Sequence, residues 1–243
     1  MKFTIPTEED IKYLNEELTK KNAQERLVWA AKTFTPGIAV SSSFQTQSVP
    51  LLHLVSQSCP EMPVIFIDTG FHFPETLAFR DMLKEKFHLN IHIIHPTITK
   101  EQLILDYGTE LYRRDPDLCC YINKIEPMQR ATAQYQVLVA GVRHDQTKHR
   151  NALRVIERRF SGPVRIHPII DWSENDILQY ITEHNLPAHP LTAQGYTSIG
   201  CAPCTQPTSR ETTDKRAGRW TGKEKTECGL QIDFDKKQIG AGE

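Results

Sequence analysis

The sequence lacks any apolar run that approaches the ~20 residues needed to cross a bilayer, and this argues against a membrane protein. It also lacks G-x-x-x-x-G-K-[ST] and G-x-G-x-x-G, so ordinary P-loop hydrolysis and dinucleotide binding are poorly supported. Basic charge is not in excess, because 29 Lys and Arg are balanced by 30 Asp and Glu. No global positive field draws the chain to nucleic acid, and we expect no such partner.

The segment MKFTIPTEED at Met1 to Asp10 is polar and acidic. It has neither the apolar core of a secretory signal nor the Arg- and Ser-rich pattern of a transit peptide. Six cysteines without an export signal indicate a reducing compartment, where metal ligation and catalysis are commoner than disulfides. We therefore expect a cytoplasmic protein. Cys59, beside Pro60, is expected to be a packed thiol without a chemical role.

Short apolar strands alternate with helical segments, an order typical of a doubly wound, mostly parallel α/β sheet. The predicted strands are Ile38–Val40, Val64–Ile67, Ile91–Ile94, Val137–Ala140 and Val164–Ile170. The predicted helices lie at about Glu8 to Lys32, Pro50 to Val55, from Pro74 onward, and Glu174 to His184 behind a Ser173/Asp176 cap. We expect one domain, divided into a helical segment (1–35), an α/β core that binds a nucleotide (36–187) and a loop-rich segment (188–243).

Cysteines occur in a pattern that suggests two uses. Cys119 and Cys120 are adjacent, Cys201 and Cys204 enclose Ala-Pro, and Cys228 precedes a glycine. Four thiolates in two pairs can hold a tetrahedral metal or an iron–sulfur cluster, which leaves the fifth thiol as a nucleophile. Adjacent ligands favour a polynuclear cluster, whose several metal corners need not be met by one chelate geometry. Counting cysteines leaves both zinc and iron–sulfur open.

Polar loops follow two of the predicted strands, where open α/β sheets bind ligands. Ser41-Ser42-Ser43 offers hydroxyl and N–H groups to a phosphate or sulfate, although serines there could simply cap a helix. Asp68-Thr69-Gly70 could contact a nucleoside or could simply form a turn.

Basic side chains gather in the segments Arg143 to Arg150 and Lys215 to Trp220. A charge run taken alone is usually solvated surface. Guanidinium groups nevertheless suit small ligands with several negative charges, and both segments can converge on one mouth of the sheet. Together they predict a polyanionic substrate.

Seven motifs occur in an order similar to that of the assimilatory adenylylsulfate/phosphoadenylylsulfate reductase family, in its iron–sulfur adenylylsulfate branch. The resemblance runs from about Ala39 to Gln231. It implies a PP-loop fold of the adenine-nucleotide alpha-hydrolase-like type with a flexible C-terminal catalytic tail. The motifs are Ser41-Ser42-Ser43-Phe44, Ile67-Asp68-Thr69-Gly70 with Pro74-Glu75-Thr76, Cys119-Cys120-x-x-x-Lys124-x-Glu126-Pro127, Gly141-Val142-Arg143-x-Asp145-Gln146, Ser198-Ile199-Gly200-Cys201-x-Pro203-Cys204-Thr205, Arg216-Ala217-Gly218-Arg219-Trp220 and Glu227-Cys228-Gly229-Leu230.

This resemblance implies reduction of adenylylsulfate to sulfite and AMP by a thioredoxin-type dithiol protein, in sulfate assimilation for cysteine biosynthesis. Cys228 would attack the substrate sulfur and carry an S-sulfo intermediate. A [4Fe–4S] cluster would be ligated by Cys119, Cys120, Cys201 and Cys204. Substrate-binding roles would fall to Ser41, Ser42, Ser43, Asp68, Thr69, Gly70, Lys124, Arg143, Arg216 and Arg219.

The chain departs from the family pattern at Gln45, where glycine is usual, at His144, where a second arginine is common, and at Gln231, which replaces a histidine. Alternative interpretations are a phosphoadenylylsulfate or dual-specificity reductase, an iron–sulfur tRNA-thiolating PP-loop enzyme, and a zinc-stabilised binding module without catalysis. The tRNA-thiolating enzyme would require an ATP-pyrophosphatase loop of the Ser-Gly-Gly-x-Asp-Ser kind and a basic face that binds RNA. A homo-oligomer is compatible with the sequence.

Overall fold

The computed structural model describes residues 6–158, 162–209, 212, 214, 216–223, 225, 227, 229 and 230. Its first elements are α1 (Glu8–Thr19), α2 (Ala23–Phe34), β1 (Ile38–Ser41), η1 (Thr46–Ser48), α3 (Val49–Ser58), β2 (Val64–Ile67), α4 (Pro74–Phe87), β3 (Ile91–Ile94), α5 (Lys100–Tyr107) and α6 (Leu111–Arg114). The chain continues through α7 (Pro116–Cys120), the π-helical turn η2 (Tyr121–Ile125), α8 (Glu126–Thr132), β4 (Val137–Ala140), η3 (His144–Gln146), α9 (Lys148–Asn151), β5 (Ile156–Glu157), β6 (Val164–Ile166), α10 (Glu174–Glu183), η4 (Pro190–Gln194) and η5 (Ala202–Cys204).

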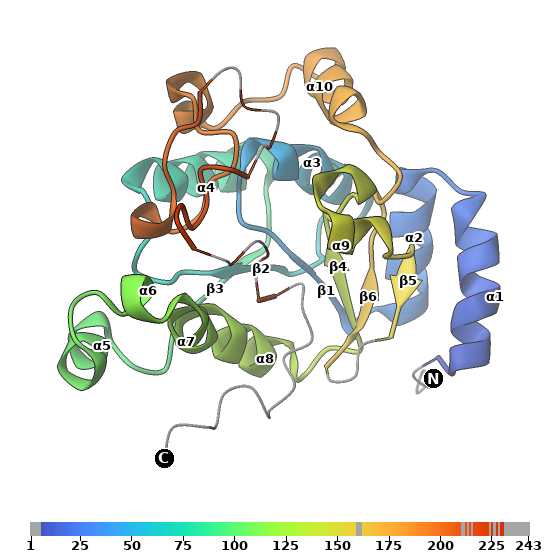
Figure 1. Ribbon diagram of the computed structural model, residues 1–243. Coiled ribbons are helices and arrows are strands. Elements are labelled where there is room, and N and C mark those ends of the chain that lie inside the picture. Colours follow the sequence, from blue (N-terminus) through green and yellow to red (C-terminus); the bar gives the residue numbers. More distant parts are fainter. Residues whose placement is uncertain are drawn as a thin grey trace.

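A six-stranded sheet with the order β3-β2-β1-β4-β6-β5 forms the centre of the molecule (Figure 1). Every neighbouring pair is parallel except β5 and β6. The chain leaves β1 toward β2 and β3 and then returns to β4 on the other side of β1. This reversal places a crevice at the carboxyl ends of β1 and β4, where doubly wound sheets bind ligands. The predicted doubly wound, mostly parallel sheet is confirmed.

Alternation along the strands divides the core between the two faces of the sheet. Val40 and Phe66 belong to the larger core, which includes residues of α2, α3 and α4. Ala39 and Ile65 belong to a smaller core beneath α8, which contacts β2 and β3. Figure 1 shows α3 and α4 on one side of the strands and α8 on the other. β1, β2 and β4 are buried almost throughout, which explains why these three strands are almost continuously apolar in the sequence.

Several predicted boundaries shift in the structure. The single helix expected from Glu8 to Lys32 is two helices, because Asn22 accepts a hydrogen bond from the Glu25 N–H and starts α2 with a capping box. β6 ends at Ile166, because the following residues form a turn in which the Ile170 N–H bonds to the His167 carbonyl. The Ser173/Asp176 cap of α10 is confirmed. The short elements α5 to α8 and β5 were not predicted.

Beyond α10, the described chain is mostly turns and short 3₁₀ segments, consistent with the loss of periodicity after Ala188. Isolated bridges join His72 to Cys201 and Thr205 to Arg219, so this part lies against the carboxyl ends of the strands. Within the described part of the chain, every helix is too short or too polar to cross a membrane. The division of the domain at residues 35 and 187 stays a prediction.

Candidate active site

A cavity of about 430 Å³ opens at the carboxyl ends of β1 and β4. Its walls come from the loops after both strands and from segments near residues 124, 199 and 216. Among the described residues that line it, five side chains are cationic and three are carboxylates. The cationic ones are Lys124, Arg143, Arg150, Arg216 and Arg219, and the carboxylates are Asp145, Glu174 and Asp214. The two basic segments, 143–150 and 215–220, therefore both contribute side chains to one cavity at the carboxyl ends of the strands, as predicted.

The serine loop forms the wall of this cavity after β1, and all three predicted serines line it. Phe44 adopts a left-handed conformation with φ of 52°, and its N–H donates to Ser42 Oγ at 3.1 Å. Its ring is fully buried and meets Phe66 edge-on, which holds this unusual backbone in place. The tight turn thus directs Ser41, Ser42 and Ser43 to the cavity.

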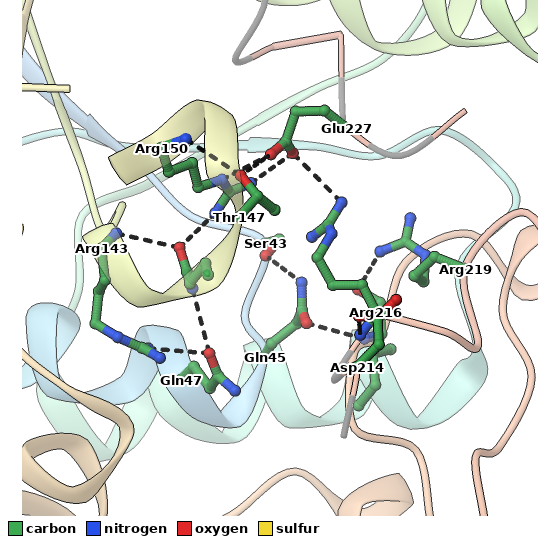
Figure 2. A network of polar contacts seen from close by, with 12 residues as sticks. Ser43, Gln45, Gln47, Arg143, Thr147, Arg150, Asp214, Arg216, Arg219 and Glu227 are labelled. Atoms are coloured by element: carbon green, nitrogen blue, oxygen red, sulfur yellow. Dashed lines mark hydrogen bonds and ion pairs between the residues drawn. The ribbon is translucent and has the colours of Figure 1, made fainter. Parts of the chain in front are cut away.

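Gln45 connects the serine loop to the far wall of the cavity (Figure 2). Its side-chain N–H group donates to Ser43 Oγ at 3.0 Å, and its Oε1 accepts the Ile199 N–H at 2.9 Å. A glycine at this position could make neither contact. The departure from the family pattern therefore adds a crosslink between two loops that are distant in the sequence.

Two of the arginine side chains that line the cavity are buried and bonded to neighbours. Arg143 donates to Asp145 at 3.0 Å and to Gln47 at 3.0 Å. Arg219 donates to the Ile199 carbonyl at 3.3 Å, while its Nε makes no hydrogen bond to any described residue. Its guanidinium also lies 4.5 Å from the centre of the Trp220 ring. These contacts fix guanidinium groups beside the cavity before any ligand binds.

The four predicted cluster ligands lie together around a second cavity of about 20 Å³, which is lined by Cys119, Cys120, Cys201 and Cys204. Burial, followed by the neighbouring thiols, raises the pKa of Cys119 to about 12. Burial likewise raises the pKa of Cys204 to about 11. The fold thus brings two cysteine pairs that are far apart in the chain together around one cavity. Across the described residues, no three His, Cys, Asp or Glu side chains are arranged for a single metal ion.

Lys124 lines both cavities. It belongs to the π-helical turn η2, which directly follows the cysteine pair of α7. Such wide turns recur at functional sites because they redirect side chains out of the regular helical spacing. Asn123 in the same turn is buried, and its amide donates to the Cys119 carbonyl at 2.9 Å. The turn therefore places the Lys124 ammonium between the four cysteines and the larger cavity.

Asp68, Thr69 and Gly70 do not line the larger cavity. Thr69 Oγ1 instead lies 3.4 Å from Cys201 Sγ, and the Gly70 N–H donates to Asp68 Oδ1 at 3.0 Å. Gly70 has φ of 70°, a conformation that glycine adopts readily. The loop is thus a turn beside the cysteines, and its nucleotide-binding role stays a prediction.

Cys228, the predicted nucleophile, lies outside the described residues, as does Gln231. Other side chains of the site were not assigned from the sequence. His72 lines the larger cavity, where burial lowers its imidazole pKa to about 4. Gln47 contacts Arg143, and Glu227 contacts Arg150. Glu227 stands beside Cys228 in a quoted motif, which was the available signal, whereas nothing in the sequence distinguishes Gln47.

Comparison with known proteins gives consistent matches. Residues 37–207 match the family model described as "Phosphoadenosine phosphosulfate reductase domain". The chain is 42% identical over 231 residues to the adenosine 5'-phosphosulfate reductase of Streptomyces coelicolor, covering 92% of this chain and 96% of that one. It is 39% identical over 210 residues to the phosphoadenosine 5'-phosphosulfate reductase of Gloeobacter violaceus, covering 84% and 86%. The solved phosphoadenylyl-sulfate reductase of Candida auris, a phosphate complex, aligns with a TM-score of 0.74 at 32% identity, over 82% of this chain and 98% of that one.

Proposed function

Because the chain belongs to the phosphoadenosine phosphosulfate reductase family, we propose that it reduces adenylylsulfate to sulfite and AMP with a thioredoxin-type dithiol protein as reductant. The main support for this proposal is the cationic cavity at the carboxyl ends of β1 and β4, which lies directly beside the four cysteines. The cavity suits a nucleotide with a strongly anionic end. Its neighbouring thiols suit sulfur chemistry.

Positive side chains have a specific task in this reaction. A thiolate that attacks a sulfate group is repelled by its negative oxygens, and negative charge then grows on the leaving phosphate. Fixed cations lower the barrier most when they stand where this charge develops. We assign the phosphosulfate to Lys124, Arg216 and Arg219, with Arg143 beside them, and the nucleotide to Ser41 to Ser43.

The proposed first step transfers the sulfo group to Cys228. Its thiolate forms a bond to the substrate sulfur, the bond from that sulfur to the phosphate oxygen breaks, and AMP leaves with the electron pair. One thiolate of the dithiol protein then attacks Cys228 Sγ and expels sulfite. Its second thiol resolves the mixed disulfide, which regenerates the Cys228 thiolate and leaves the partner oxidised by two electrons.

We propose that Cys119, Cys120, Cys201 and Cys204 hold a [4Fe–4S] cluster. The fit rests on the donor set, because four cysteine sulfurs around one small cavity are the usual ligands of such clusters. Bound there, the cluster would tune charge beside Lys124, since the electrons come from the dithiol. Asn123 and Thr69 would position two of the ligands, Cys119 and Cys201.

We predict a preference for adenylylsulfate over its 3'-phosphorylated form. A 3'-phosphate needs an additional cation, and Arg150 is the buried candidate near the cavity. All three of its donor nitrogens are already engaged, two by Glu227 and one by Gln146. The extra phosphate would have to displace this internal carboxylate, so its binding should be penalised.

The test of function and preference is one assay of sulfite release with reduced thioredoxin and each nucleotide. We expect kcat/KM to be about tenfold higher for adenylylsulfate, a difference of ~1.4 kcal/mol. A higher value for the 3'-phosphorylated nucleotide would reverse the preference but leave the reductase assignment intact. Failure of both nucleotides to yield sulfite would overturn the assignment itself.

Gly200 is predicted to be required for the position of Arg219. A Cβ atom at residue 200 would lie 2.2 Å from Arg219 Nη2, so Gly200→Ala must displace the guanidinium from its place on Trp220. We expect a roughly tenfold rise in KM for adenylylsulfate with little change in thermal stability. Steady-state kinetics and calorimetry measure the two effects.

The control for this prediction is a double-mutant cycle. If Gly200 acts through Arg219, then Gly200→Ala should have no further effect in an Arg219→Ala background. Independent, additive losses in the double variant would show that the glycine is needed for another reason.

A further inference from the structure

Glu227 is buried beside Arg150 and Arg216, two cationic side chains that line the larger cavity (Figure 2). Its carboxylate accepts two hydrogen bonds from the Arg150 guanidinium in a bidentate arrangement, one from Nε at 2.9 Å and one from Nη2 at 2.7 Å. Arg216 donates to the same carboxylate at 3.3 Å, and Thr147 Oγ1 donates at 3.1 Å. A carboxylate held by one paired guanidinium and two further donors has a fixed position.

Arg150, which donates twice to Glu227, is itself anchored to the loops that follow β1 and β4. Arg150 donates to Gln146, whose side-chain amide donates to Gln47 Oε1 at 3.2 Å. Gln47 also accepts from Arg143, the residue that follows the end of β4 by three positions. Figure 2 shows this chain of contacts from Gln47 to Glu227. These hydrogen bonds connect Glu227 to the loop after β1 and to the loop after β4, which both line the larger cavity.

Residues on either side of Glu227 are also attached to the body of the protein. The Lys225 ammonium pairs with Asp117 of α7 and lies 5.6 Å from the centre of the Trp220 ring. Leu230 lines the larger cavity and packs against the smaller core under α8. Position 228 therefore falls in the chain between an ionic anchor at 227 and an apolar anchor at 230.

We propose that Glu227 is a positioning residue for Cys228, because its buried ion pairs with Arg150 and Arg216 fix the backbone at residue 227 beside two cations that line the cavity. The inference rests on the proposed function, in which Cys228 attacks the substrate. Arg216 has two tasks here, because it binds Glu227 and lines the cavity. Docking of the segment and binding of an anionic substrate are thus linked through one guanidinium.

A positioning role differs from a stabilising role in what its loss changes. In Glu227→Gln the anchor is weakened, so sulfonation of Cys228 should slow, since misplacing a reacting group by ~1 Å can cost about 100-fold. Nucleotide affinity should persist or increase, because Arg150 and Arg216 lose their internal carboxylate. A merely structural role would instead reduce nucleotide binding and sulfonation together.

The experiment compares wild type, Glu227→Gln, the milder Glu227→Asp and the exposed control Glu16→Gln. Each is mixed with saturating adenylylsulfate without reductant, and the rate of SO₃ addition to the Cys228 peptide is followed by mass spectrometry. The Kd for AMP and the iodoacetamide alkylation rate of that peptide without nucleotide are measured in parallel.

For Glu227→Gln we expect about 100-fold slower adduct formation, an AMP Kd within about threefold of wild type or lower, and about tenfold faster alkylation. Glu227→Asp, which keeps the charge, should lie between this variant and wild type, and Glu16→Gln should match wild type. Adduct formation at the wild-type rate in Glu227→Gln, or loss of AMP binding in proportion to the adduct, would overturn the positioning role alone. Absence of the adduct in wild type would overturn the proposed function and this inference with it.

Discussion

Cys228→Ser is expected to lower sulfite release by at least ~10³-fold, because a serine hydroxyl without an activating base is a poor nucleophile. The variant should still bind AMP, since the described cavity walls contain the cations and serines that we assign to the nucleotide. Without reductant, wild type should gain the mass of one SO₃ group on the Cys228 peptide, and the variant should gain none. Addition of reduced thioredoxin should remove the adduct and release sulfite.

Cys59→Ser is the matched control for this experiment. Cys59 is half-buried at the end of α3 and packs against the larger core, away from the cysteine group. Its loss should leave both the adduct and turnover unchanged. Persistent turnover by Cys228→Ser, or an adduct that maps to Cys59, would contradict the division of the cysteines into four ligands and one nucleophile.

Cys201→Ser is expected to remove iron and acid-labile sulfide from anaerobically purified protein. Three remaining thiols leave one corner of the cluster open to solvent and oxidation. The backbone β-bridge between Cys201 and His72 should survive the substitution, so the change is confined to the side chain, which contacts Thr69 Oγ1 through its sulfur. Metal analysis, sulfide assay and visible absorption measure the cofactor, and the AMP Kd reports the condition of the neighbouring cavity.

Cys59→Ser again provides the control and should retain full iron and sulfide. Zinc at full occupancy without sulfide in wild type would exclude the cluster and support the zinc interpretation of the same four thiols. Iron that survives in Cys201→Ser would show that this cysteine is not a required ligand.

Lys124 lies between the two cavities. Its turn begins directly after Cys120, and the same side chain lines both cavities. Loss of the proposed cluster should therefore disturb the cationic side of the larger cavity as well as the cysteines. This arrangement explains why a cofactor that carries no electrons in the proposed reaction would still matter for turnover.

Much of the fold could be predicted, because the strands are short apolar runs and the caps are local. Ser173 and Asp176 start α10 through contacts three residues apart, which a sequence displays directly. The break between α1 and α2 was missed, although Asn22 and Glu25 form a capping box three residues apart and the residues around Asn22 are almost all polar. The short elements around the cysteines depend on tertiary contacts and a π-turn, so local propensity does not reveal them.

The sequence by itself determined the chemistry available to this protein, because thiols, guanidinium groups and serine hydroxyls carry their reactivity in the residue type. Their order along the chain was enough to predict four ligands, one nucleophile and an anionic substrate. Only the tertiary structure decided which side chains meet. It joins Gln45 to Ile199, fits Arg219 against Gly200, and closes Arg150 around Glu227. Such pairs are far apart in sequence, and only the packing of the loops at the carboxyl ends of the strands brings them within contact distance.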